Sequence, residues 1–140
     1  MLAQVSTLRP EARVDGLLVQ QMGPADASEL LLGMVRDPQF GPLVMVGFGG
    51  IYVEVLNDTA TRLAPLDADE AAAMVDELRM APVLRGARGR PPADLRALTD
   101  TISRFAQLTV DVPQLQELEI NPLLVGAHGP VAVDVRGTLA

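Results

Sequence analysis

Four polar side chains near the end of the sequence have types and spacings that suit metal or phosphate chemistry. Glu119 and Asn121 stand two residues apart in an alternation of apolar and polar residues, and Asp134 and Arg136 repeat that spacing. Such alternation is typical of a half-buried strand, on which every second side chain points the same way. Each pair therefore presents its two polar groups on one face of its strand.

The segment between the two pairs predicts how they meet. Residues 126–129 include two glycines and are typical of a tight turn, so the flanking strands should form an antiparallel hairpin. If the turn is symmetric about its two central residues, with either two or four residues in the loop, Asn121 lies opposite Asp134. In the same register Glu119 lies opposite Arg136, with Cβ atoms about 4.5–5.5 Å apart.

This polar face has two interpretations. It could be a solvated sheet face with one ion pair, which contributes only about 0–1 kcal/mol. Alternatively, an amide and a carboxylate held side by side on rigid strands suit Mg²⁺, which takes oxygen ligands at about 2.0–2.1 Å and keeps waters or phosphate oxygens in its shell. The spacing alone does not choose between them.

The same residues carry a resemblance. EINPL (residues 119–123) followed by VD (133–134) resembles the metal-binding end of the ATP-grasp domain in NDP-forming acyl-CoA synthetases. That family includes ADP-forming acetate–CoA ligases and, more distantly, the β subunit of succinyl-CoA synthetase. Three upstream segments match it in the same order: RDPQFGP (36–42), GFGGIYVEV (47–55) and RLAPL (62–66). The resemblance extends from about residue 15 to residue 136.

The resemblance implies catalytic and metal-binding roles. It makes Asn121 and Asp134 the Mg²⁺ ligands, bridging to the β- and γ-phosphate oxygens of ATP or GTP. Glu119 resembles the glutamate that holds a phosphohistidine during phosphoryl transfer at the nucleotide site, which a carboxylate can do by accepting the imidazole N–H. Arg136 either holds Glu119 in place or meets phosphate directly.

A nucleotide site is implied further upstream. Gln20, Gln21 and Met22 lie where the family has the hinge whose backbone groups read the adenine edge, although an ordinary buried strand would have the same side chains. Glu29 resembles the acidic position near the nucleotide ribose. The alternative is that Glu29 is a surface carboxylate with no role in nucleotide binding.

A glycine-rich loop follows. Gly49 and Gly50 let backbone approach a ligand or simply make a turn, and the resemblance favours a ligand. Glu54 stands in an apolar run, where a carboxylate usually has a specific partner or function. The resemblance places it at the phosphate end of the nucleotide site without defining its role. Arg62 either points at phosphate or pairs with Glu54.

The remaining pattern predicts an α+β fold. Strands are expected at residues 17–22, 29–36, 43–47 and 59–66, before the final hairpin. Asp67 and Glu70 have capping-box spacing at the start of one helix, which Pro82 should end. A second helix should follow Pro91-Pro92, with its apolar stripe at Leu95, Leu98, Ile102, Phe105 and Leu108. We expect a mainly antiparallel sheet with two helices packed on one face and the ligand on the other.

Composition limits the function classes. The 140 residues indicate one domain, and a net charge of −7 argues against a nucleic-acid surface. The sequence has no cysteine, secretory signal or membrane-length apolar run, and we expect a cytoplasmic protein. All 11 basic residues are arginine, so the lysines with which the family's N-terminal lobe grips phosphates are missing.

The resemblance therefore covers the C-terminal half of an ATP-grasp domain, without the N-terminal lobe or the CoA-binding, phosphohistidine-bearing domain. We expect these as partners in the same or another chain, and an oligomer. His128 stands in the hairpin turn, where it should be solvated. The implied function is the nucleotide- and Mg²⁺-binding lobe of an NDP-forming acyl-CoA synthetase, inactive alone. The alternatives are a non-catalytic module for assembly or regulation, or a lobe of another ATP-grasp ligase.

Overall fold

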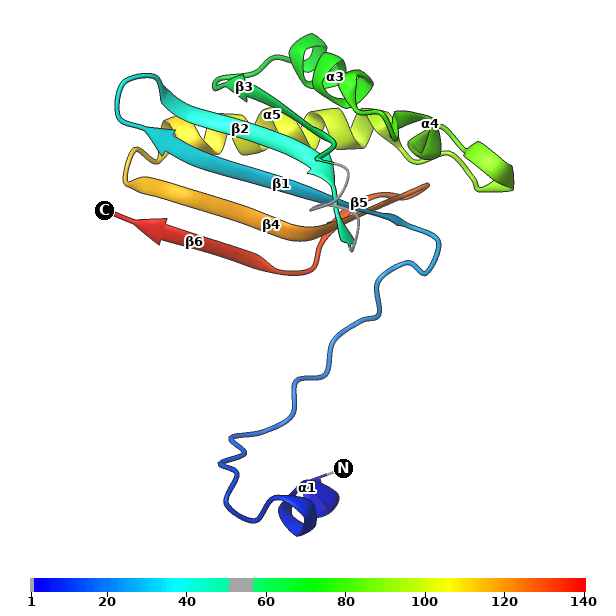
Figure 1. Ribbon diagram of the computed structural model, residues 1–140, viewed down its shortest axis with the longest axis vertical. Coiled ribbons are helices and arrows are strands. Elements are labelled where there is room, and N and C mark those ends of the chain that lie inside the picture. The colour runs from blue at the N-terminus through cyan, green and yellow to red at the C-terminus, as the bar shows by residue number, and fades with distance from the viewer. Residues whose placement is uncertain (1, 51–56) are drawn as a thin grey trace.

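The computed structural model describes residues 2–50 and 57–140, and these form one antiparallel sheet with helices on one face (Figure 1). The α+β fold class predicted from the sequence is confirmed. The helices and strands are α1 (Leu2–Leu8), β1 (Ser28–Asp37), β2 (Gly41–Phe48), β3 (Thr59–Leu63), α3 (Ala68–Glu77), α4 (Ala81–Leu84), the 3-10 helix η2 (Ala87–Gly89), α5 (Leu95–Asp111), β4 (Leu115–Gly126), β5 (Gly129–Ala132) and β6 (Val135–Leu139).

The described residues make a six-stranded sheet in the order β3-β2-β1-β4-β5, with β6 also paired to β4. Every strand pair is antiparallel. β1 lies between β2 and β4, which agrees with its nearly continuous apolar sequence, because a central strand is flanked on both edges and has little contact with water. β5 and β6 lie end to end along the outer edge of β4, so the second strand of the predicted hairpin is divided in two.

The core lies between the sheet and the helices. Leu30 and Leu32 of β1 and Val44 and Val46 of β2 are fully buried on the helix side. Ile102 of α5 is likewise fully buried against them. Burying one such side chain contributes about 1.5–3 kcal/mol. The side chains between these core positions on each strand point to the opposite, open face of the sheet.

The start of α3 confirms the capping box, but its end differs from the prediction. The Asp67 carboxylate accepts the Glu70 N–H, and the Glu70 carboxylate accepts the Asp67 N–H. α3 ends at Glu77, and Pro82 stands in the first turn of the separate helix α4, where its missing N–H costs nothing. The break between α3 and α4 is stabilised by buried Asp58, whose carboxylate accepts hydrogen bonds from the N–H groups of Arg79 and Met80.

α5 begins at the Asp94 cap and ends at Val112. Its predicted apolar stripe is correct except at its last member, since Leu108 is 44% exposed and its neighbour Thr109 is fully buried instead. The Thr109 hydroxyl donates to the Ala106 carbonyl at 2.7 Å, which allows a polar side chain to occupy this core position. None of the helices in the described part of the chain combines the length and apolar character needed to cross a membrane.

A β-bulge in β4 changes the predicted alternation. The register between β1 and β4 shifts between Leu30 and Leu32, so two residues of β4, Asn121 and Pro122, face one residue of β1. Just before the bulge the even-numbered residues Leu118 and Ile120 pack against the core, whereas after it the odd-numbered residues Leu123 and Val125 are buried. The bulge thus lets both halves of this long strand contribute to one core.

Residues 17–22 are not a strand in the structure, contrary to the sequence prediction. They lie in an exposed, extended segment that carries α1 away from the sheet (Figure 1). A strand needs a neighbour for its backbone hydrogen bonds, and no sheet strand among the described residues lies beside this segment. Periodicity identified the apolar run but could not show whether a pairing partner is present.

Candidate functional site

The four polar residues of the predicted cation site come together on the open face of the sheet. Glu119 pairs with Arg136 across β4 and β6, as predicted. The Asn121 N–H donates to the Asp134 carbonyl at 3.1 Å, so these two residues also lie opposite each other. All four side chains line one hollow of about 160 Å³, which we call the polar hollow. The turn has two residues between the paired Gly126 and Gly129, which gives the predicted register.

Contacts inside the polar hollow differ from the predicted pairing of side chains. Asn121 Nδ2 donates to Glu119 Oε1 at 2.8 Å, which leaves Asn121 Oδ1 as an acceptor for another group. Arg136 Nε lies 3.3 Å from Asp134 Oδ2, so the arginine pairs with Asp134 and not with Glu119. The Arg136 and Asp134 side chains are 84% and 54% exposed. A pair this exposed contributes about 0–1 kcal/mol and can rearrange when a ligand arrives.

The oxygen ligands in the polar hollow suit a hard cation that keeps other ligands in its coordination shell. Two carboxylates and an amide oxygen are the oxygen ligands that Mg²⁺ prefers. Among the described residues no three His, Cys, Asp or Glu side chains cluster as a closed metal cage. A cation here would therefore need waters or phosphate oxygens to complete its coordination, which is how Mg²⁺ binds at nucleotide sites.

Three of the predicted nucleotide-binding residues also come together. The Gly49 N–H donates to the Glu29 carbonyl at 2.7 Å. A Cβ on Gly49 would stand 3.2 Å from the same carbonyl group, which is closer than an ordinary contact, so glycine favours this close approach. Gly50 has a φ of +80°, and its missing side chain leaves room for Glu29 Oε2. The glycine loop and Glu29 thus form one cluster at the start of β1.

The other residues predicted to bind nucleotide or phosphate are not observed on the open face of the sheet. Gln20, Gln21 and Met22 lie in the exposed N-terminal segment, away from the polar hollow. Glu54 lies outside the described residues. The Arg62 guanidinium pairs with Glu77 of α3, on the helix side of the sheet. Arg62 is paired with the buried Val44 in the register of β2 and β3. Paired residues of neighbouring strands point to the same face of a sheet, so Arg62 points away from the open face.

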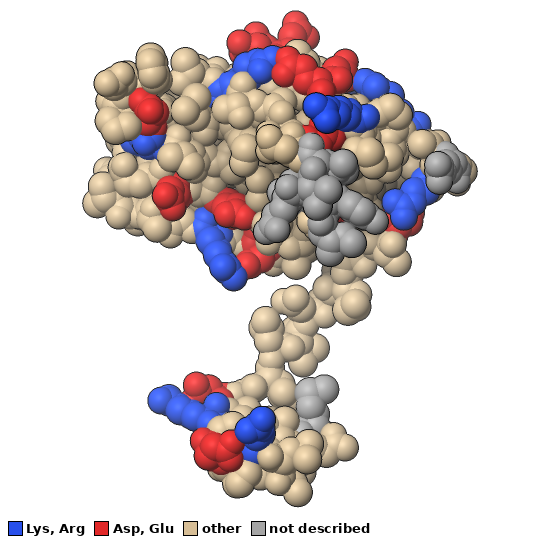
Figure 2. All heavy atoms as spheres, viewed as in Figure 1, with Lys and Arg blue, Asp and Glu red and all other residues tan. Residues whose placement is uncertain are grey.

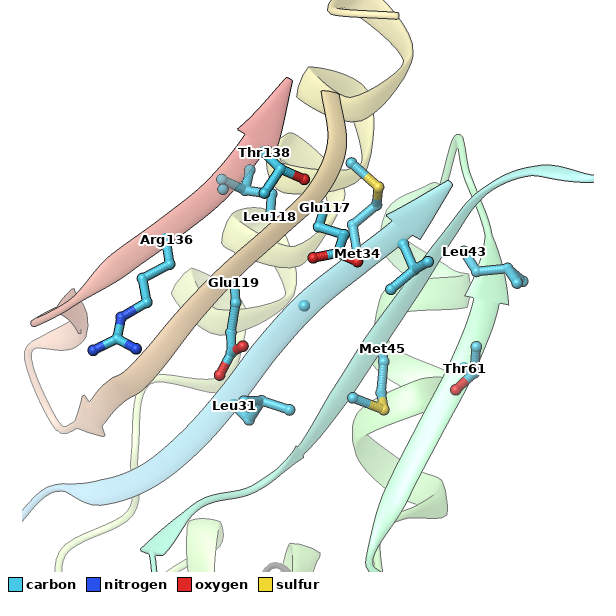
Figure 3. Close-up of a pocket in the computed structure, with 13 residues that line it drawn as sticks. Leu31, Met34, Leu43, Met45, Thr61, Glu117, Leu118, Glu119, Arg136 and Thr138 are labelled. Atoms are coloured by element: carbon cyan, nitrogen blue, oxygen red, sulfur yellow. The ribbon is translucent and has the colours of Figure 1, made fainter. Parts of the chain in front are cut away.

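An apolar groove of about 440 Å³, which the sequence did not predict, lies beside the polar hollow. Its floor crosses β1, β2 and β3, and Glu119 and Arg136 stand at its border with the hollow (Figure 3). Gly33 lies in the middle of this floor, where a Cβ would meet nothing nearer than a backbone oxygen at 3.8 Å. A glycine inside an apolar strand was the available signal, because it often marks a close approach by another group.

Comparison with known proteins identifies the class. The ATP-grasp domain model matches residues 1–139, and the chain belongs to the ATP-grasp domain family. Its relatives include acetate–CoA ligase [ADP-forming] I of Archaeoglobus fulgidus, 45% identical over 139 residues, which are 99% of this chain and 20% of that protein. The β subunit of acetate–CoA ligase [ADP-forming] I of Pyrococcus furiosus is 41% identical over 128 residues, 91% of this chain and 55% of the subunit. The chain spans about half or less of these relatives.

Solved structures agree with this assignment. Dinucleotide-forming acetyl-coenzyme A synthetase 1 of Ca. Korarchaeum cryptofilum, in complex with coenzyme A and Mg-AMPPCP, superposes with a TM-score of 0.80 at 37% identity, over 85% of this chain and 55% of that one. The apo form gives a TM-score of 0.86 at 35% identity, over 99% of this chain and 66% of that one. Both fold and sequence therefore relate the chain to this branch of the family.

Proposed function

We propose that the chain is the nucleotide- and Mg²⁺-binding lobe of an ADP-forming acid–CoA ligase. The observation that carries the proposal is the polar hollow, where Glu119, Asn121, Asp134 and Arg136 meet on the open face of the sheet. A relative of the same fold was solved with coenzyme A and Mg-AMPPCP, which supports the same ligand class here. The complete reaction would convert ATP, an acid and CoA to acyl-CoA, ADP and phosphate.

The residues of the polar hollow would act mainly by positioning. Asn121 Oδ1 and the Asp134 carboxylate would hold Mg²⁺, which when bound would screen the charge of the nucleotide phosphates. Arg136 would turn from Asp134 toward a phosphate oxygen, since its exposed ion pair is weak. Glu119 would accept the N–H of an incoming histidine, which orients the imidazole for phosphoryl transfer.

Other parts of the ligase would come from other domains or chains. Glu29, Gly49 and Gly50 form only one wall of the nucleotide site we propose, at the start of β1. The proposal therefore includes an N-terminal ATP-grasp lobe and a CoA-binding domain with the phosphohistidine, and assembly into an oligomer. Location in the cytoplasm is part of the same proposal, because the reaction draws on ATP and CoA.

Substitution in the polar hollow tests this function. We expect Asp134→Asn to weaken Mg·ATP binding at least about tenfold, which is about 1.4 kcal/mol, and Asn121→Ala to act in the same direction. The binding should be measured by calorimetry on the full chain mixed with the complementary part of the P. furiosus β subunit, meaning the part that this chain does not match. The wild-type mixture should lose the same affinity when Mg²⁺ is removed, and the variants should be insensitive to removal.

Glu117→Gln is the matched control. Glu117 is exposed on the same face of β4, two residues before Glu119, and lines the apolar groove but not the polar hollow. Its neutral variant should bind Mg·ATP as the wild type does. If Asp134→Asn and Asn121→Ala leave the affinity and its Mg²⁺ dependence unchanged, the cation site is not in the polar hollow and the proposed function is wrong.

A further inference from the structure

β6 forms an outer edge of the sheet. It pairs with β4 and with no other strand in the described part of the chain (Figure 1). All five of its residues are exposed. An edge strand presents a row of N–H and C=O groups to any further strand that can pair with it, so β6 is a candidate interaction surface.

Two hydrogen bonds show which backbone groups of β6 point outward. Just before β6 the Asp134 carbonyl accepts the Asn121 N–H at 3.1 Å, and just after it the Ala140 N–H donates to the Gln114 carbonyl at 2.8 Å. Successive residues of a strand direct their backbone groups to alternate edges, so the even-numbered residues of β6 also bond β4. The groups on the outer edge belong to Val135, Gly137 and Leu139.

β6 lacks the features that commonly keep an edge strand from pairing. β5, which continues the same edge, contains Pro130, a residue without an N–H. β6 has no proline, and its one charged side chain, Arg136, lines the polar hollow on the open face. Figure 2 shows that charged side chains over this edge gather at the start of β6 and that the rest of its surface is largely uncharged.

The outward-bonding residues of β6 also expose apolar side chains. Val135 is 55% exposed and Leu139 is 69% exposed. They pair with Ile120 and Leu115 of β4, which pack in or against the core, so both lie on the helix side of the sheet. An added strand would cover these two side chains while it satisfied the backbone groups beside them.

The sequence of β6 is self-complementary in one antiparallel register. A two-fold axis at Gly137 places Val135 opposite Leu139 of a second copy, so apolar side chains meet on the helix side. On the open face it places Arg136 opposite Thr138 of that copy. All five residues then pair, and every outward backbone group has a partner. A register centred on Arg136 would set two arginines directly opposite each other, which is destabilising.

We propose that β6 is a self-association surface, and that two copies of the chain join by antiparallel pairing of β6 with β6 about a two-fold axis at Gly137. Such an interface is closed, because each copy uses the same strand. The axis is perpendicular to the sheet, so the two open faces and their polar hollows point to the same side. This inference specifies the oligomer of the proposed function and rests on that function only in this respect.

Hydrogen exchange on the full wild-type chain, without nucleotide, tests the backbone pairing. As the protein concentration rises through the Kd of the dimer, amide exchange at Val135, Gly137 and Leu139 should slow at least about threefold, because pairing protects these N–H groups. The amides of Arg136 and Thr138 bond β4 and should already be protected in the monomer. This alternation along β6 is specific to strand pairing.

Charge substitutions test the register. Leu139→Glu and Val135→Lys should each raise the Kd of the dimer at least tenfold, measured by sedimentation equilibrium up to about 1 mM protein. The double variant Val135→Lys/Leu139→Glu places opposite charges across the two-fold axis and should have a Kd at least about fivefold lower than either single variant. The two positions are about 13 Å apart in one strand, so this recovery requires a second copy.

Val131→Glu is the control. Val131 is 44% exposed on β5, outside the proposed pairing, and its variant should dimerise with the wild-type Kd. Val131, Val135 and Leu139 do not belong to the core cluster, so all the variants should keep the wild-type unfolding midpoint. A loss of dimer in Leu139→Glu could then not be attributed to misfolding.

Four outcomes would overturn the inference: a wild-type chain that stays monomeric up to about 1 mM, a dimer in which the outward amides remain unprotected, a wild-type Kd in Leu139→Glu, or no recovery in the double variant. A dimer that ignores both substitutions would be formed by another surface. Asp134→Asn should lose Mg·ATP affinity in the test of the proposed function while it keeps the wild-type Kd of the dimer. Failure of the β6 experiments with an intact Asp134→Asn effect would therefore reject only this inference.

Discussion

Individual residues at the polar hollow owe their arrangement to backbone register and not to strong side-chain contacts. Asn121 bonds Glu119 at 2.8 Å, and Arg136 stands 3.3 Å from Asp134, but none of these side chains is buried. The backbone hydrogen bond from Asn121 to Asp134 sets which residues face each other. Side chains that are placed by the sheet but weakly tied to one another can change partners when a cation and phosphates bind.

Arg36 shows the opposite case, a charged residue used to build the fold. Its guanidinium donates to the carbonyls of Thr109 and Leu115 at 2.7 Å each, and to that of Val112 at 3.4 Å. It therefore ties the end of α5 and the start of β4 to β1. Cations near a helix C-terminus also interact favourably with the helix dipole. Arg36 belongs to a segment that resembles the family, yet its observed role is structural.

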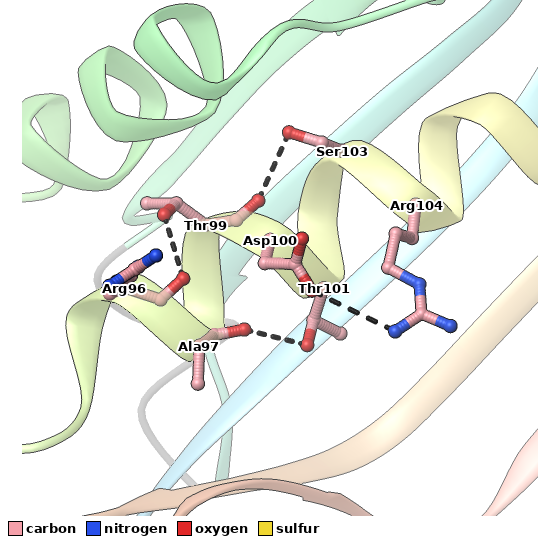
Figure 4. Close-up of polar contacts among 7 residues, drawn as sticks. All are labelled: Arg96, Ala97, Thr99, Asp100, Thr101, Ser103 and Arg104. Carbon is pink, nitrogen blue, oxygen red and sulfur yellow. Dashed lines mark hydrogen bonds and ion pairs between the residues drawn. The ribbon is translucent and has the colours of Figure 1, made fainter.

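Arg36→Met is expected to lower the free energy of unfolding by about 1.5–3 kcal/mol, because hydrogen bonds to a charged group are lost and carbonyls are left without a donor. Urea unfolding followed by circular dichroism measures this. Arg104→Met is the control, since Arg104 is exposed on α5 and, among the residues that the structure describes, forms an ion pair only with Asp100, at 3.7 Å (Figure 4). That variant should stay within about 0.5 kcal/mol of the wild type. Equal effects at the two positions would contradict the assigned role.

Two glycines on neighbouring strands give a second test at the residue scale. Gly33 and Gly47 both belong to the sheet, but a Cβ at Gly47 would lie 2.7 Å from Thr59 Cγ2 and 3.0 Å from the Asp58 carbonyl oxygen. At Gly33 the nearest atom would be 3.8 Å away. Gly33→Ala should therefore be neutral or stabilise the fold by up to about 1 kcal/mol, whereas Gly47→Ala should destabilise it by about 1–3 kcal/mol. Thermal unfolding of the two variants distinguishes these signs, and a destabilised Gly33→Ala would mean that the groove floor has no room.

At the scale of elements, two local devices decide where β4 and the helices lie. The bulge at Asn121 and Pro122 lets both halves of β4 bury apolar side chains on the helix side. The two-residue turn, and not the bulge, places Asn121 opposite Asp134, because the register of β4 with β5 and β6 continues through residues 119–126 without a shift. The second device is the break between α3 and α4, where Asp58 reaches from the start of β3.

Asp58→Ala should destabilise the domain by about 1–3 kcal/mol. The Asp58 carboxylate is 7% exposed and accepts the N–H groups of Arg79 and Met80 at 2.7 and 2.9 Å, which would be left without an acceptor. Chemical denaturation measures the loss. Asp26→Ala, at an exposed position in the turn before β1, should have an effect below about 0.5 kcal/mol. A wild-type midpoint for Asp58→Ala would show that the break is held by packing alone.

α5 combines an apolar face with polar side chains whose hydroxyl groups form hydrogen bonds within the helix. Thr99, Thr101 and Ser103 donate to carbonyls of the preceding turn (Figure 4). These bonds let three hydroxyls stand on a 17-residue helix without unsatisfied polar groups. The helix consequently presents Leu98 and Ile102 to the sheet and a neutral, hydrogen-bonded flank beside them.

On the scale of the whole molecule, the sheet with its helices and the exposed N-terminal segment before β1 differ in how they are stabilised. The core cluster draws its residues from β1 onward, and α1 contributes no buried residue. Removal of residues 2–22 should therefore shift the thermal midpoint by no more than a few degrees, which corresponds to about 1 kcal/mol or less in a domain of this size. Calorimetry of the shortened chain tests this. A fall of ten degrees or more would show that the N-terminal segment supports the sheet directly.

The amino-acid sequence by itself determined the α+β class, the capping box at Asp67 and the register that brings Asn121 beside Asp134. Each of these depends on local periodicity, cap chemistry or turn length, which neighbouring residues specify. The family membership was also readable from the order of short motifs, and the comparison with known proteins confirms it. The site roles carried over from the resemblance stay predictions until Asp134→Asn and Asn121→Ala are measured.

Only the tertiary structure decided the partners of the charged groups and the position of the N-terminal segment. Arg62 pairs with Glu77 and Arg36 binds three carbonyls, because partners separated in the sequence meet only after the sheet and helices have packed. Arg136 pairs with Asp134, two residues before it, and not with Glu119, which lies opposite it on β4. The bulge in β4 likewise follows from the need to bury both ends of one strand against the same helices. The run at residues 17–22 is apolar in any context, but whether it forms a strand depends on a neighbouring edge, and no local pattern carries that information.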